Sequence, residues 1–197
     1  MKNVLIALRM LLGMTLITGV LYPLLVVGIA QGFMKSRANG DLVVVGGKVV
    51  GARLIAQKFT DEKYFWPRPS AVDYDTLPAG GSHLGPTSAL LKESVAERMA
   101  VLIKAHGVTS PDEVPRELLF ASGSGIDPHI GLRAAYFQID RVAKARGLDP
   151  LLGREALRNC VDEAIEGSRF GFLGPVYVNV FLLNVRLDEK FPAKDRS

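Results

Sequence analysis

Apolar residues fill the start of the chain almost without interruption. Residues 10–34 contain no charged side chain, and the stretch up to Ala30 is nearly all apolar. In a helix that rises about 1.5 Å per residue, roughly 20 apolar residues cross a hydrocarbon core about 30 Å thick. The pattern therefore predicts a short tail at residues 1–9 and one transmembrane helix at residues 10–34.

Beyond this segment, residues 35–197 change to shorter runs of mixed polarity. β-Branched residues on both sides of a Gly-Gly pair predict a hairpin over residues 40–51. An apolar run at residues 118–120 predicts a buried strand, and alternation over residues 177–185 predicts a final strand. Residues 52–59 are expected to form one helical turn.

Three longer segments have apolar positions at helical spacing. They predict helices over residues 88–105, with Ser88 as the N-cap, over residues 131–146 and over residues 149–167. Residues 64–85 contain too many prolines and glycines for a long regular element. Because strands and helices mix without regular βαβ units, we expect the α+β class, with a single N-terminal transmembrane helix followed by one compact mixed α/β extramembrane domain.

The net charge of +4 comes from the flanks of the apolar segment. Residues 1–40 hold four basic residues and no acidic one, whereas the other 20 basic residues balance the 20 Asp and Glu. A neutral domain is not typical of a nucleic-acid-binding protein, so no nucleic-acid partner is expected. The four basic residues are Lys2, Arg9, Lys35 and Arg37.

Two of these basic residues precede the predicted span and two follow it, so the positive-inside rule does not decide the orientation. A short tail is easily left in the cytoplasm, whereas a large domain crosses largely regardless of its charge. We therefore expect the N-terminus inside and the domain outside.

Cleavage of the apolar segment is the alternative to a permanent anchor. Small residues at 28–30 resemble a signal-peptidase site, and cleavage there would release a secreted binding protein. The apolar stretch is longer than the 7–15 residues of a signal peptide, which favours the anchor. The single cysteine, Cys160, excludes an intrachain disulfide, and its place in a helical pattern is typical of a buried, unreactive thiol.

A glycine-rich loop at residues 121–130 contains the residue types of a hydrolase. Ser124, Asp127 and His129 occur in it, so an anchored serine hydrolase using Ser124, with His129 or His83 as base, is an alternative function. A nucleophile elbow, however, needs G-x-S-x-G, and here the glycines flank the serine directly. Only three histidines exist, without metal-type spacing, so no metal site is expected.

The loops also contain candidates for structural or partner-contact roles. Residues 80–86 offer backbone N–H groups to an anion but lack the lysine of a phosphate site. Arg68 stands between two prolines and is expected to clamp a carboxylate of its own domain or of a partner. The full candidate set is Arg68, Gly80, Gly81, Ser82, Gly85, Ser122, Gly123, Ser124, Gly125, Asp127 and His129.

Two further features have structural interpretations. Asp127-Pro128 is expected to begin the helix that follows the loop. The basic cluster at residues 141–146 is expected to complement the dipole at a helix end.

Six short segments follow the apolar span in a fixed order. They are Gln57-Lys58-Phe59, the run from Tyr64 to Ala71, the run from Gly80 to Pro86, residues 121–130, Arg141-Val142-Ala143 and Val178-Asn179-Val180. Each motif alone is weak, but together they cover nearly the whole chain. In this order after one N-terminal span, they resemble the C subunit of the Kdp-type potassium-transporting ATPase.

The resemblance implies a complex of four kinds of subunit in the bacterial inner (plasma) membrane. Its partners would be a potassium-channel-like subunit, a P-type ATPase subunit, a small subunit and the lipid bilayer. The C subunit would have no catalytic residues, would be needed for assembly, and would act as a catalytic chaperone that raises the ATP affinity of the ATPase subunit. The sequence shows no cofactor bound by this chain alone, and the resemblance implies that ATP and potassium are ligands of the complex. A periplasmic domain cannot touch cytoplasmic ATP, so we expect indirect coupling.

Overall fold

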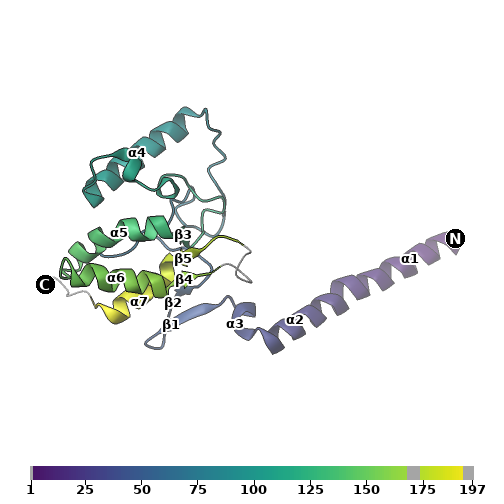
Figure 1. The fold of residues 1–197 in the computed structure, drawn as a ribbon. Coiled ribbons are helices and arrows are strands. Elements are labelled where there is room, and N and C mark those ends of the chain that lie inside the picture. The colour runs from purple at the N-terminus through teal and green to yellow at the C-terminus, as the bar shows by residue number, and fades with distance from the viewer. Residues whose placement is uncertain (1, 168–173, 193–197) are drawn as a thin grey trace. The chain divides into compact units, whose positions relative to one another are not determined.

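The computed structural model describes residues 2–167 and 174–192. The chain divides into two compact units, one ending at Ala52 and the other beginning at Arg53 (Figure 1). Each unit is described by itself below.

The first unit begins with one long apolar helix from Lys2 to Phe33, which has the length and composition to cross a membrane. It comprises α1 (Lys2–Thr15), a π-helical stretch (Leu16–Leu21) and α2 (Tyr22–Phe33). Residues 2–9 therefore continue the helix. The wider turn precedes Pro23, whose ring would meet the carbonyl of residue 19 in a regular α-helix. The proline thus changes the local winding without ending the helix.

A short helix, α3 (Lys35–Ala38), and a β-hairpin complete the first unit. The hairpin consists of β1 (Leu42–Val45) and β2 (Lys48–Ala52), which pair antiparallel. Gly46 and Gly47 both have positive φ, as a tight two-residue hairpin turn requires. The predicted hairpin is confirmed.

The second unit is a compact mixture of helices and short strands, which confirms the α+β class. Its three-stranded antiparallel sheet has the order β3 (His129–Gly131), β5 (Tyr177–Asn179), β4 (Ile165–Glu166). Its helices are α4 (Ala89–His106), α5 (Leu132–Ala145), α6 (Leu152–Glu163) and α7 (Val180–Lys190). In Figure 1, α5, α6 and α7 lie together, and α4 lies on the opposite side of α5.

Helices α5, α6 and α7 supply most of the hydrophobic core. Val142 of α5, Leu157 of α6 and Leu183 of α7 are completely buried. Phe65 is equally buried although it belongs to the irregular segment, so that segment is part of the core. Cys160 is buried in the same cluster, as its pattern predicted.

The predicted helices are confirmed, with small changes at their ends. The Ser88 hydroxyl accepts the N–H of Leu91 at 3.4 Å, which makes Ser88 the N-cap of α4. Asp149 accepts the N–H groups of Leu151 and Leu152, so α6 starts at Leu152. The segment predicted as its last turn, residues 165–166, is strand β4 instead.

The final strand was predicted too long. Strand β5 ends at Asn179, and residues 180–190 form helix α7. The Asn179 side chain accepts the N–H of Leu182 at 3.0 Å and so caps this helix. Alternating burial over three residues cannot distinguish a strand from the start of a buried helix.

Three other predicted elements were wrong. Residues 118–120 are no strand: a 3-10 turn (Arg116–Leu118) follows Pro115, although Leu118 and Leu119 are buried as expected. Residues 52–59 form no helical turn, because the Ala56 N–H donates to the carbonyl of Ile126. Asp127-Pro128 precedes strand β3, and α5 begins only at Leu132.

Candidate functional site

The two glycine-rich loops pack against each other through their backbones. A Cβ atom on Gly81 would lie 3.1 Å from the carbonyl oxygen of Gly123. A Cβ on Gly125 would lie 2.6 Å from both the Gly80 oxygen and a Val72 methyl group, and Gly125 has φ +72°. Glycine is therefore required at position 125 by both conformation and space.

An ionic chain joins this junction to the sheet. The Arg68 guanidinium lies 3.4 Å from one carboxylate oxygen of Asp127, which confirms the clamp expected within the domain. The other carboxylate oxygen accepts the backbone N–H of His129 at 3.1 Å and lies 3.3 Å from its Nδ1. Burial raises the pKa of Asp127, but hydrogen bonds from His129 and the nearby Arg68 charge outweigh it and lower the pKa below its ordinary value.

Ser124 and His129 are engaged in separate local contacts. The Ser124 hydroxyl accepts the N–H of Ile126 at 3.3 Å, which is a turn within the loop. The His129 ring faces Asp127 and packs edge-on against Tyr177, with ring centroids 4.4 Å apart. Ser122 is buried, and its N–H donates to the Pro69 carbonyl at 3.0 Å. These contacts tie the loop to neighbouring segments.

Two cavities lie beside α4, Arg98 of this helix lines both, and one of them also includes Gly81 of the glycine-rich junction. The first, about 370 Å³, is lined by Ser70, Ala71, Gly81, Ser82, Leu84, Leu91, Ser94 and Arg98. The second, about 470 Å³, is lined by Phe59, Thr60, Trp66, Pro67, Pro69, Tyr74, Glu97, Arg98, Val101, Leu102 and Leu118. Ser82 thus borders the first cavity, whereas Gly85 accepts the N–H of Ser88 at the start of α4.

The irregular segment that borders these cavities is held by side-chain amides. Asn184 of α7 accepts the N–H of Phe65 and donates to its carbonyl, both at 2.9 Å. Gln138 of α5 does the same for Trp66, at 2.7 and 3.1 Å. Each side-chain amide hydrogen-bonds the N–H and the carbonyl of one residue, as a neighbouring strand would. The backbone groups of Phe65 and Trp66 are therefore satisfied although they belong to an irregular segment. Sequence reasoning missed Asn184 and Gln138, because a polar residue in a predicted helix or strand looks like part of the face exposed to solvent.

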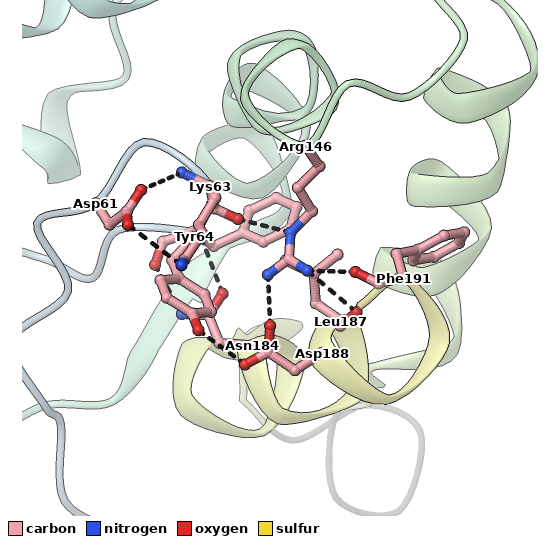
Figure 2. A network of polar contacts seen from close by, with 9 residues as sticks. Asp61, Lys63, Tyr64, Arg146, Asn184, Leu187, Asp188 and Phe191 are labelled. Atoms are coloured by element: carbon pink, nitrogen blue, oxygen red, sulfur yellow. Dashed lines mark hydrogen bonds and ion pairs between the residues drawn. The ribbon is translucent and has the colours of Figure 1, made fainter. Parts of the chain in front are cut away.

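The basic cluster does lie at the end of α5, with Lys144 in the last turn and Arg146 as the C-cap, but Arg141 and Arg146 also bind the irregular segment, a role that was not predicted. Arg141 is buried, donates to the carbonyls of Glu62 and Tyr64, and lies 3.9 Å from the centre of the Trp66 ring. Arg146 donates to the Lys63 carbonyl at 2.9 Å (Figure 2). The available signal was the position of both arginines beside the apolar residues Val142, Ala143 and Ala145.

The fold and site define a protein that joins one helix of membrane-spanning length to a compact α+β domain with two cavities beside helix α4. The family model for the K⁺-transporting ATPase, c chain (KdpC), matches residues 4–189. The chain belongs to this family.

Relatives support the assignment over almost the full length. A potassium-transporting ATPase KdpC subunit of Leptospira interrogans is 48% identical over 187 residues, covering 94% of this chain and 93% of that protein. The Rhodospirillum rubrum protein of the same name is 47% identical over 188 residues, covering 94% and 95%. That of Geobacter metallireducens is 41% identical over 196 residues, covering 98% and 100%.

Proposed function

We propose that this chain is a non-catalytic accessory subunit of an ATP-driven complex for high-affinity potassium uptake. The observation that carries the proposal is the family match from residue 4 to residue 189. The proposed partners are a channel-like subunit that selects potassium, a P-type subunit that hydrolyses ATP, a small subunit and the surrounding bilayer. Potassium and ATP are ligands of the complex and not of this chain alone.

The proposed topology is a single pass through the bacterial inner membrane, with the N-terminus in the cytoplasm and the domain in the periplasm. The apolar helix from Lys2 to Phe33 supports the span. The small number of residues before the uncharged stretch supports the orientation, because a short N-terminal segment is easily left in the cytoplasm. The candidate loops 80–86 and 121–130 would then be available to partners on the outer side.

We further propose that the subunit acts as a catalytic chaperone, which aids assembly and raises the ATP affinity of the P-type subunit indirectly. A periplasmic domain shares no compartment with cytoplasmic ATP, and no Walker lysine follows either glycine-rich loop. Coupling of this kind needs only that the chain bind one conformation of the complex more tightly than another.

Complementation tests the function. A strain that lacks this subunit is expected to fail to grow at limiting potassium, and the full chain is expected to restore both growth and co-purification with the ATPase subunit. In the purified complex, removing the chain is expected to raise the KM for ATP. Unchanged potassium uptake in its absence would exclude the accessory role.

Cysteine labelling tests the topology. Leu77 is 91% exposed, so Leu77→Cys in a Cys160→Ser background gives a single accessible thiol in the domain. A membrane-impermeant maleimide is expected to label it in intact spheroplasts. Labelling only after the membrane is opened would place the domain in the cytoplasm and make direct nucleotide contact feasible.

A further inference from the structure

Helix α4 buries less of itself than the other long helices of its unit. It has 18 residues and only Leu102 is buried, whereas the 14 residues of α5 include seven buried ones. Val101 is 57% exposed and lines the apolar cavity. Val95, Met99 and Ile103 pack partly buried against the core, so one side of α4 is covered, whereas Leu90 and Val101 remain exposed.

The two cavities beside α4 differ in chemistry. The lining of the cavity of about 370 Å³ includes Ser70, Ser82, Ser94 and Arg98 beside Ala71, Gly81, Leu84 and Leu91, and it contains no acidic residue. Serine hydroxyls and a guanidinium are hydrogen-bond donors, so this cavity suits a carboxylate or another oxyanion.

The neighbouring cavity of about 470 Å³ is lined mainly by aromatic and aliphatic side chains, and suits a large apolar group. Glu97 stands in its lining and repels an anion there. The charges therefore place an acidic group on the serine side of Arg98 and an apolar group on the other.

Arg98 is fixed between the two cavities. Its Nη1 donates to the Leu119 carbonyl at 2.8 Å, which uses one of the five N–H groups of the guanidinium. The orientation of the group is thus set before any ligand arrives, and a pre-organised guanidinium loses little freedom on binding.

We propose that the cavities on the two sides of Arg98 form one docking site for a segment of a partner subunit that carries a carboxylate next to a large apolar side chain. The proposal deepens the proposed function, because it assumes that the chain works inside a complex. The carboxylate enters the serine-lined cavity, and the apolar side chain covers Val101 in the adjacent one.

The test measures how much of this chain co-purifies with the complex when the complex is isolated through a tag on a partner subunit. Ser94→Leu fills the polar cavity and leaves the Arg98–Leu119 bond in place, and Arg98→Gln removes the charge. Each is expected to lower the retained amount of this chain at least tenfold. Ala96→Leu adds the same bulk on the exposed opposite side of α4 and is expected to be retained like the wild type.

The outcomes separate the two proposals. If Ser94→Leu and Arg98→Gln are retained like Ala96→Leu, the docking site is wrong and the accessory function stands. If the wild-type chain itself is not retained, the proposed function fails. Thermal unfolding of the purified full chains checks the fold, and Ser94→Leu decides the question if Arg98→Gln is unstable.

Two further experiments test which group occupies the cavities. A benzoyl-phenylalanine at position 101 is expected to cross-link to a partner peptide with Asp or Glu within two residues of a large apolar residue. A cross-link to a peptide without an acidic residue overturns the proposed chemistry. Saturable binding of inorganic phosphate to the full chain is the second measurement. If Ser94→Leu abolishes this binding but leaves retention in the complex unchanged, the cavity binds a free anion and the docking proposal is wrong.

Discussion

Arg146, the C-cap of α5, and Asp188 of α7 form an ion pair in which the guanidinium is buried and the carboxylate is not. Nη2 of Arg146 lies 2.7 Å from Oδ1 of Asp188, and the two side chains are 1% and 47% exposed. The same guanidinium donates to the carbonyls of Lys63 and Phe191 (Figure 2). Asp188 also accepts the hydroxyl of Tyr64 at 2.9 Å, so this pair connects the irregular segment to the last helix.

Removing this guanidinium is expected to destabilise the domain. Arg146→Met leaves carbonyl acceptors without a donor in a buried place, and each unsatisfied group costs about 1–3 kcal/mol. We expect the free energy of unfolding to fall by about 3 kcal/mol, measured by urea denaturation. Arg154→Met is the control. Arg154 forms an ion pair with Asp140 at 3.0 Å in which the side chains are 64% and 62% exposed, and exposed pairs contribute about 1 kcal/mol or less. Equal losses in both variants would contradict the central role of Arg146.

His106 is expected to make stability depend on pH. Its Nδ1 lies 3.0 Å from the Leu102 carbonyl and its Nε2 accepts Arg141 Nε at 3.2 Å, an arrangement that requires a neutral ring. Burial lowers its pKa to about 4; the Leu102 hydrogen bond partly opposes this effect, and the Arg141 charge adds a smaller lowering.

Because the pKa of His106 is lower in the folded protein, the unfolded chain binds its proton first as the pH falls. Stability is therefore complete above the unfolded pKa of about 6.5 and declines from there down to about pH 4. From pH 7 to pH 5 we expect a loss of about 1 kcal/mol, less than the full shift because the ring is partly exposed. His106→Gln should remove this part of the pH dependence of the urea midpoint, and an unchanged dependence would contradict the assignment.

The glycine junction gives a matched pair of substitutions. Gly125→Ala forces a Cβ to within 2.6 Å of backbone at φ +72°, so we expect a loss of about 3 kcal/mol from conformational strain and overpacking. Gly123→Ala meets no atom within 4 Å and should change stability by less than about 0.5 kcal/mol. Urea denaturation and growth at limiting potassium measure both. Similar behaviour of the two variants would show that the loops do not depend on this contact.

Ser124→Ala tests the hydrolase alternative. The Ser124 hydroxyl serves a local turn, so the variant is expected to support growth at limiting potassium like the wild type. The wild-type chain is likewise expected not to react with a serine-directed phosphonate. Labelling that disappears in Ser124→Ala, together with loss of function, would establish a nucleophile and overturn the non-catalytic assignment.

The sequence by itself determined the elements that depend on local pattern. The long apolar helix follows from length and composition, and the hairpin turn follows from two glycines. Helix α4 could be predicted from spacing and its serine cap, because these features need no information from distant residues. The Arg68–Asp127 pair was anticipated only as a clamp whose partner was unknown.

Only the tertiary structure decided where the last strand becomes a helix and which polar residues are buried. Asn179 caps α7 and also donates to the Arg53 carbonyl, a contact across 126 positions. Asn184 and Phe65 pair across 119 positions, and Arg146 and Asp188 across 42. A polar side chain has the same appearance in sequence whether it faces water or a buried backbone group. Its role is fixed only when folding brings that group within hydrogen-bonding distance.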